Sequence, residues 1–277
     1  MIWIILLVAG AVLILLPLLY LGSIAPRMIA KPNMGAFRSY FYAHRGLYNN
    51  RSEAPENSLE AFKRAVEAGY GMELDVRLTK DRIPVVFHDE TLERMCGQNG
   101  RVCDYTYEEL KAFKLGVSEE RIPLFADVLK LVDGRTPLIV ELKIETMETT
   151  LCPIVDKLLS GYKGLYCIES FNPLALWWYR LHRGKVARGQ LSTAFAKDHE
   201  GNGPHHFAIQ ELLLNFISKP DFIAYNFKHS GILSRRICCN VFGATAVAWT
   251  IRSEADLQKA RKQFDLFIFE GFRPCQS

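Results

Sequence analysis

The beginning of the chain lacks charged side chains. Ile2 to Leu21 is uncharged and long enough for a helix to cross the hydrocarbon core of a bilayer. It also lacks the basic residues that open a secretory signal, and its only small-residue cleavage pattern, Ser23-Ile24-Ala25, is followed by Pro26. We therefore expect residues 1–24 to form a single-pass transmembrane anchor, with a cleaved signal as the alternative.

Basic residues are absent before this segment but follow it closely, as Arg27, Lys31 and Arg38. The positive-inside rule then favours a cytoplasmic location for the domain that follows, although a span with few flanking charges can invert. Residues 25–40 are predicted to be a juxtamembrane linker. We expect its basic side chains to act as anchors at the bilayer, where they could also attract anionic headgroups.

Other signals are missing from the rest of the chain. The seven cysteines are an odd count without the spacing of a disulfide framework. The net charge of +4, without a stripe of basic and aromatic residues, argues against a nucleic-acid partner. No pattern implies a protein partner. Internal repeats and low-complexity linkers are absent, so residues 41–277 are predicted to form one domain.

Short apolar strands alternate with helical stretches through this domain, a pattern typical of an α/β fold with a parallel sheet. Eight such strands predict a TIM (β/α)8 barrel. The strands are expected near Tyr42, Met72, Leu138, Tyr166, Arg188, Phe222, Ala246 and Phe267.

A small insertion is expected after the second strand. The gap from Leu78 to Arg82 is too short for a crossover helix, so 73–78 and 84–89 should form an antiparallel hairpin. The insertion would continue to Leu124, cover the active face of the barrel, and lead into a helix at 125–132.

Polar side chains gather where these strands end. His44-Arg45-Gly46 provides a proton carrier, a fixed cation and a residue that lets the backbone approach a ligand. Glu73 and Asp75 share one strand face because side chains alternate. With Glu141 on another strand they predict an oxygen-rich site for a divalent metal ion, Mg²⁺ or Ca²⁺.

Further candidates lie beside these groups. Lys143 shares the face of Glu141, and the hairpin brings His88 next to Asp75. Trp249, at a strand end, is expected to line the pocket with its apolar face. Glu56 either contributes to the site or merely satisfies the first turn of a helix over 59–68, which Asn57 or Ser58 would cap.

Three other patterns are given ordinary structural interpretations. His205-His206 is expected in a loop, because adjacent histidines do not present both rings to one metal. Cys238-Cys239 lacks zinc-site spacing. The run Trp177-Trp178-Tyr179 is expected in a helix, with an interfacial contact to lipid as an alternative.

The order of the motifs resembles the glycerophosphodiester phosphodiesterase family from about residue 41 to the C-terminus. The matching motifs are His44-Arg45-Gly46, Pro55-Glu56-Asn57-Ser58, Glu73-Leu74-Asp75, His88-Asp89, Glu141-Leu142-Lys143, and further echoes at 91–94, 122–124, 170–171 and 249–250. Two positions depart from the pattern: Arg252 where an Asn is usual, and Glu270 where an Asp is common.

The resemblance implies a phosphoric diester hydrolase that acts on a glycerophosphodiester or a lysophospholipid and releases a phosphomonoester and an alcohol. The apolar N-terminal segment would anchor this enzyme in a membrane. We expect His44 and His88 to transfer protons and Glu73, Asp75 and Glu141 to hold the metal. Arg45, Lys143, Glu56 and Trp249 are expected to contact substrate. A cyclising phospholipase, a lysophospholipase D and a non-catalytic lipid-headgroup module on the same barrel remain open alternatives.

Overall fold

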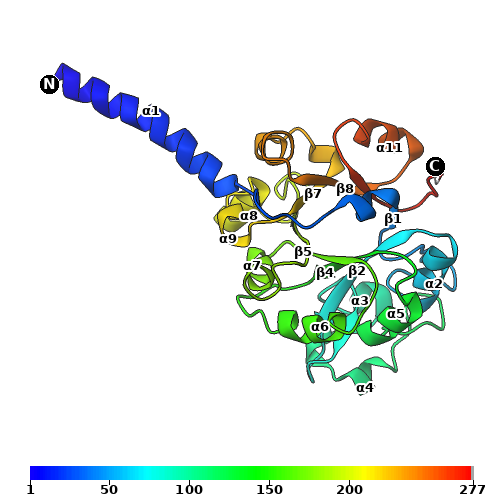
Figure 1. Ribbon diagram of the computed structural model, residues 1–277. Helices are drawn as coiled ribbons and strands as arrows, with labels where there is room; N and C mark the ends of the chain where they lie inside the picture. The colour runs from blue at the N-terminus through cyan, green and yellow to red at the C-terminus, as the bar shows by residue number, and fades with distance from the viewer. Residues whose placement is uncertain (276–277) are drawn as a thin grey trace.

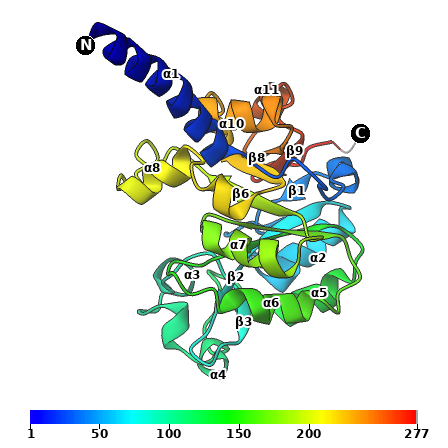
Figure 2. The same cartoon turned by 60° about the vertical axis from the view of Figure 1, so that its left-hand side comes forward.

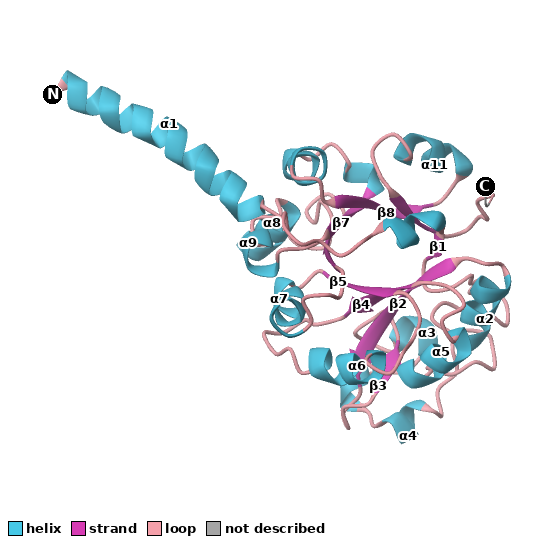
Figure 3. Ribbon diagram, in the orientation of Figure 1, coloured by secondary structure: helices cyan, strands magenta, loops and turns pink. Residues whose placement is uncertain are grey.

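The strands of this computed structural model, which describes residues 1–275, form one sheet that closes into a barrel (Figures 1 and 3). Neighbouring strands follow the order β1-β9-β8-β7-β6-β5-β4-β2, and β1 pairs with β2 to close the ring. These eight strands are parallel, so the predicted TIM (β/α)8 barrel is confirmed. Their bounds are β1 (Tyr42–Ala43), β2 (Gly71–Leu78), β4 (Leu138–Leu142), β5 (Tyr166–Ser170), β6 (Arg188–Ser192), β7 (Phe222–Asn226), β8 (Thr245–Ile251) and β9 (Leu266–Phe269).

Helices surround the barrel (Figure 3). The longer ones after the strands are α2 (Leu59–Glu67), α5 (Phe125–Val132), α6 (Leu151–Leu159), α7 (Pro173–His182), α8 (Pro204–Gln210) and α11 (Glu254–Ala260). Shorter helical segments are η1 (Gly35–Ser39), α9 (Asn215–Ser218), η3 (Phe227–His229), α10 (Leu233–Arg236) and η4 (Ile237–Val241). Of the two expected caps for α2, Ser58 takes the role, because its hydroxyl accepts from the Ala61 N–H.

Alternation along the strands sorts the side chains into two layers. In β2, Met72 and Leu74 pack outward among residues of the surrounding helices such as Phe62. On the inward face, Ile139 of β4 and Cys167 of β5 belong to a second apolar cluster, two residues before the acids of the same strands. A layer of apolar side chains therefore fills the barrel beneath the polar residues at the carboxyl ends of the strands.

The predicted hairpin and insertion are present. The strand β3 (Pro84–Val86) pairs antiparallel with β2, and the Phe87 N–H donates to the Asp75 carbonyl at 2.9 Å. The insertion continues through α3 (Glu93–Cys96), η2 (Val102–Asp104) and α4 (Tyr107–Leu110). It has its own buried cluster, which includes Leu110 and Leu115. His88 therefore belongs to a small packed unit attached to the barrel.

The helix α1 (Ile2–Ile24) projects from the barrel (Figures 1 and 2). Within residues 1–275 it is the one helix long and apolar enough to cross a membrane; such a helix near an N-terminus fits either a span or a signal sequence. Its last residue, Ile24, is fully buried, and the Ile24 carbonyl accepts from the Asn215 amide at 2.9 Å. The helix is thus joined firmly to the barrel.

The segment after α1 packs against the barrel. Lys31 donates to the carbonyls of Phe242 and Gly243, and Arg38 pairs with Asp265. Arg27 donates to the Gly184 carbonyl and lies 3.6 Å from Asp221. These basic side chains therefore bind acceptors of the barrel, and their role as bilayer anchors stays a prediction.

Two local predictions are settled by the helices. His205 and His206 do not lie in a loop, as the sequence suggested, but in the first turn of α8, which begins at Pro204. Their rings lie 3.8 Å apart, centroid to centroid. A proline at the first helical position favours helix initiation, and this signal was overlooked. The run from Trp177 to Tyr179 lies in α7, as expected.

Candidate active site

A cavity of about 390 Å³ lies at the carboxyl ends of the barrel strands. Most of the predicted site residues line it, and they come from the ends of different strands. The lining residues are His44, Arg45, Glu73, His88, Glu141, Lys143, Glu169, Phe171, Leu191, Glu200, Trp249, Thr250, Arg252 and Ile268. In a (β/α)8 barrel this end of the strands is where catalytic groups gather.

Glu73, Asp75 and Glu141 come together as predicted. Each offers an oxygen that lies within 4.8 Å of the others, and all three side chains are buried. The register explains the proximity, because Asp75 of β2 is paired with Glu141 of β4. Glu169 follows on β5, paired with Glu141, and is a fourth buried carboxylate that sequence reasoning missed.

The cluster carries more negative charge than its neighbours neutralise. Burial, followed by repulsion from the neighbouring acids, raises the pKa of Glu73 well above its ordinary value. Burial also raises the pKa of Glu141 to about 7 and that of Glu169 well above normal. The Glu169 Oε2 atom has no hydrogen-bond partner within the described chain. A divalent cation fits this set of carboxylate oxygens, and Glu73, Asp75 and Glu141 would be its ligands.

Asp75 is stabilised in its charged form. Burial opposes ionisation, but Lys143 at 3.0 Å, with other cations nearby, holds the pKa of Asp75 well below its ordinary value. Lys143 also lies 2.8 Å from Glu141. The Asn57 amide donates to Asp75 at 2.8 Å from a left-handed backbone with φ of 57°. An Asn tolerates this conformation better than most residues.

Arg45 connects the carboxylate cluster to the buried carboxylate of Glu56. Its own N–H donates to Glu73 at 3.1 Å, and its guanidinium donates to Glu56 at 2.8 Å. Glu56 also accepts from Arg94 and Asn50. Glu56 is buried and is not among the residues that line the cavity. Its contacts make it a group that orients Arg45.

His44 is held by Glu270, which follows β9. The His44 Nδ1 lies 2.6 Å from the Glu270 Oε2, and the Nε2 lies 3.8 Å from Glu73. An ionised carboxylate only accepts, so Nδ1 carries the proton and a neutral ring keeps a basic Nε2. Burial and the charge of Arg45 lower the pKa of His44, while Glu270 opposes this shift.

His88 has a matching arrangement on the insertion. Its Nδ1 lies 2.7 Å from the Asp89 carboxylate, and Asp89 in turn binds Arg94. Burial and the nearby Lys143 lower the pKa of His88 to about 4, against the attraction of Asp75 and Asp89. Both histidines thus direct Nδ1 at a carboxylate and leave Nε2 available.

The remaining predicted residues divide into two cases. Trp249 lines the cavity, where its ring contacts Phe171 edge to face at a centroid distance of 5.8 Å. Gly46 serves a purpose other than the close approach to a ligand that we expected. A Cβ atom there would lie 3.0 Å from the Ala61 carbonyl carbon, so the glycine admits α2. Its φ of 83° further favours glycine.

At the sequence level Glu169 and Tyr48 were overlooked, and the roles of Asn57, Phe171 and Glu270 were not foreseen. Glu270 was noted only as a departure at a strand end, although an acid in that position is itself a site signal in a barrel. Glu169 is the fourth residue of β5, on the same face as Cys167. The alternation rule that found Glu73 would have found it.

Comparisons with known proteins agree with this geometry. The fold and the site define a (β/α)8 barrel with a carboxylate-rich mouth, and a model of the "Glycerophosphoryl diester phosphodiesterase family" matches residues 44–264. The chain belongs to this family.

Curated relatives include the glycerophosphodiester phosphodiesterase of Caldanaerobacter subterraneus subsp. tengcongensis, 39% identical over 146 residues, which are 48% of this chain and 58% of that protein. The glycerophosphodiester phosphodiesterase 1 of Homo sapiens is 28% identical over 174 residues, 58% of this chain and 51% of that protein. The chain spans about half the length of the curated relatives it matches.

Among solved structures, an Oleispira antarctica phosphodiesterase in complex with the product sn-glycerol-3-phosphate is similar with a TM-score of 0.67 and 24% identity. The match covers 83% of this chain and 92% of that one. A glycerophosphodiester phosphodiesterase from Thermotoga maritima has a TM-score of 0.64, 24% identity, and coverage of 83% and 93%. At these identities the likeness supports the barrel fold.

Proposed function

We propose that the protein is a metal-dependent glycerophosphodiester phosphodiesterase, which hydrolyses glycerophosphodiesters to a phosphomonoester and an alcohol. The observation that carries the proposal is the buried carboxylate cluster, with two histidines on the same cavity whose Nε2 atoms are available. Family membership and the names of the relatives support the substrate class.

In the mechanism, Lys143 and Arg45 bind the phosphate oxygens and offset charge that develops in the transition state. A divalent ion on Glu73, Asp75 and Glu141 would supply Lewis-acid polarisation of a phosphate oxygen. Lys143 is already fixed by two carboxylates, so little reorganisation is needed when the phosphate enters.

Protons are handled by the histidines. One of them, neutral at Nε2, accepts the proton of the attacking hydroxyl, and the other, protonated at Nε2, gives a proton to the leaving alcohol. Glu270 and Asp89 hold the two rings and stabilise the protonated forms. The nucleophile is either water or the neighbouring glycerol hydroxyl; the latter route passes through a cyclic phosphate.

The apolar wall of the cavity suggests where the glycerol half lies. Trp249 and Phe171 provide aromatic surface on one side of the cavity. This surface suits a glycerol backbone or the first carbons of an acyl chain, so lysophospholipids are a second substrate class in the proposal. We further propose that α1 anchors the protein in a membrane and that the barrel faces the cytoplasm.

Product analysis tests this function. Glycerophosphocholine, glycerophosphoethanolamine and a lysophospholipid are incubated with the full-length protein, with and without chelator, and the products are separated. We expect glycerol phosphate and free alcohol from the first two, and no turnover with chelator. Lysophosphatidic acid from the lysophospholipid would be a lysophospholipase D activity and would confirm the second substrate class. A stable cyclic phosphate would instead indicate a cyclising phospholipase, and binding without turnover a headgroup-binding module.

A further inference from the structure

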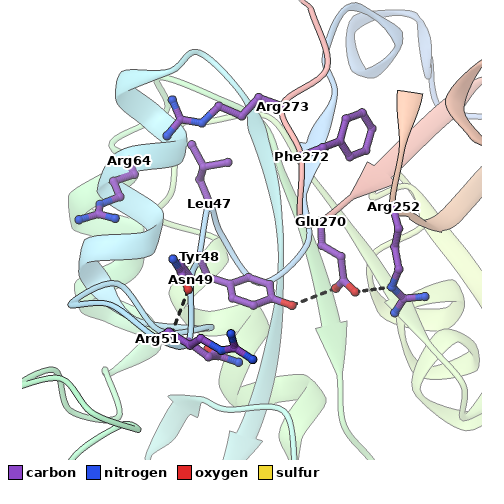
Figure 4. Close-up of a pocket in the computed structure, with 11 residues that line it drawn as sticks. Leu47, Tyr48, Asn49, Arg51, Arg64, Arg252, Glu270, Phe272 and Arg273 are labelled. Carbon is purple, nitrogen blue, oxygen red and sulfur yellow. Dashed lines mark hydrogen bonds and ion pairs between the residues drawn. The ribbon is translucent and has the colours of Figure 1, made fainter. Parts of the chain in front are cut away.

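A second cavity, of about 790 Å³, adjoins the catalytic cavity. It lies where three neighbouring strands end, because its walls are the segments that follow β1, β8 and β9, together with α2 (Figure 4). Its lining residues are Leu47, Tyr48, Asn49, Asn50, Arg51, Arg64, Arg252, Glu270, Gly271, Phe272 and Arg273.

Glu270 and Arg252 form the wall between the two cavities. One oxygen of Glu270 binds His44 and accepts from the Tyr48 hydroxyl at 3.1 Å, and the other accepts from the Arg252 Nε at 2.7 Å (Figure 4). Arg252 lines both cavities. The two cavities therefore share Arg252, and Glu270 connects the His44 ring of the catalytic cavity to the second cavity.

The second cavity carries an excess of positive charge. Its four arginines face one carboxylate, Glu270, whose oxygens are already occupied. Arg64 is held by Glu53 and Glu60 outside the cavity lining. Arg51 and Arg273 make no ion pair within residues 1–275, and Arg252 keeps its terminal nitrogens unpaired there.

We propose that this second cavity binds a phosphate carried by the alcohol half of the substrate, so that the enzyme prefers glycerophosphodiesters with a second anionic group. The proposal rests on the proposed function. Guanidinium groups suit phosphate because their N–H donors match its oxygens two at a time. The same charges disfavour a cationic alcohol such as choline.

Three water-soluble substrates separate the effect of charge from that of the diester itself. Glycerophosphocholine has a cationic alcohol, glycerophosphoglycerol a neutral one, and bis(glycerophospho)glycerol a second phosphate. We expect kcat/KM to rise in this order, with roughly a tenfold preference for the last over glycerophosphoglycerol, which corresponds to one well-placed charged contact. The preference should weaken as ionic strength rises.

The double variant Arg51→Gln/Arg273→Gln removes the two unpaired charges and should lower that preference to within about threefold. The matched control Arg236→Gln removes an exposed charge from α10, outside the cavity, and should preserve it. Inorganic phosphate distinguishes a free anion from a substrate group. Phosphate could inhibit glycerophosphoglycerol hydrolysis in the wild type but not in the double variant. If the wild type then shows no preference for the substrate with a second phosphate, the cavity is a free-anion site and the proposal fails.

Two other outcomes would each contradict one of the two proposals. Equal rates for the three substrates, or a preference that survives in the double variant, would overturn the second-phosphate site while leaving the proposed function intact. No hydrolysis of any of the three by the metal-supplied wild type would instead refute the proposed function.

Discussion

Glu270 contacts three side chains from separate parts of the chain: His44, Tyr48 and Arg252. Its carboxylate offsets the effects of burial and Arg45 on the His44 ring. Burial acts to raise the pKa of Glu270, but the contacts with His44 and Arg252 together lower it to about 2. The residue acts through His44 and is therefore a positioning residue.

Replacing Glu270 tests that role. In Glu270→Gln the pKa of His44 should fall further, because a negative charge that favours the protonated ring is gone. We expect kcat to fall roughly ten- to a hundredfold, the pH profile of kcat/KM to shift toward acid, and KM to change little. Glu270→Asp should recover part of the rate. An unshifted profile in the Gln variant would reduce Glu270 to a packing residue.

The ion pairs of Glu56 lead to a prediction about stability. Burial acts to raise the pKa of Glu56, but contacts with Arg94 and Arg45 lower that pKa from 4.5 to about 2. A lowered folded-state pKa stabilises the protein above the unfolded value, and the contribution is lost as the pH falls from about 4.5 toward 2. It amounts to about 3 kcal/mol at most, less because Arg94 is half exposed.

Denaturant unfolding between pH 7 and 3 measures this contribution. The Glu56→Gln variant should be less stable at pH 7 and lose less free energy of unfolding on acidification than the wild type. Glu108→Gln, on an exposed surface, is the control and should change stability by less than about 0.5 kcal/mol. Parallel curves for wild type and Glu56→Gln would count against the ion-pair assignment.

At the scale of elements, the insertion between β2 and α5 behaves as a separate packed unit that carries His88. Leu110 is fully buried in its cluster. Leu110→Ala should cost about 2–5 kcal/mol locally, because it leaves a cavity among few neighbours. We expect faster hydrogen exchange in residues 84–124, protected barrel strands, and a lower kcat.

Val155→Ala, in the core around α6, provides a contrast. That change should lower the global free energy of unfolding without selective exchange in the insertion. If Leu110→Ala instead loosened barrel and insertion equally, the insertion would be part of one cooperative unit with the barrel.

The sequence predicted elements governed by local rules. Strand alternation placed Glu73 with Asp75, and the short gap after Leu78 placed His88 beside them, because both depend on neighbours along the chain. The partner of His44 lies 226 residues away, so no local pattern links the two. The helix that contains His205 has only two turns and a weak apolar pattern, so periodicity did not reveal it. The need for glycine at position 46 comes from the close approach of α2, which only the folded structure shows.

For the whole molecule, α1 and the barrel are joined by buried contacts at Ile24 and Ala25. Deleting residues 2–19 should keep this junction and yield a soluble protein with unchanged turnover of glycerophosphoglycerol. Its rate on lysolipid in vesicles should fall, because the barrel is no longer held at the surface. Vesicle flotation with paired rate measurements checks this.

Two observations would contradict the proposed placement. One is that cells expressing the full-length chain yield soluble protein whose N-terminus has been removed, which would identify residues 1–24 as a cleaved signal. The other is digestion of the barrel by protease added outside intact cells, which would reverse the orientation.

Metal content measured together with turnover is the most direct test of the central claim. The purified wild type, loaded with Mg²⁺, Mn²⁺ or Ca²⁺ and passed through a desalting column, should retain about one ion per chain and hydrolyse glycerophosphoglycerol. Asp75→Asn and Glu141→Gln should lose both the ion and at least about a hundredfold in rate, while Glu108→Gln should lose neither. Full turnover by metal-free wild type in excess chelator would contradict the account.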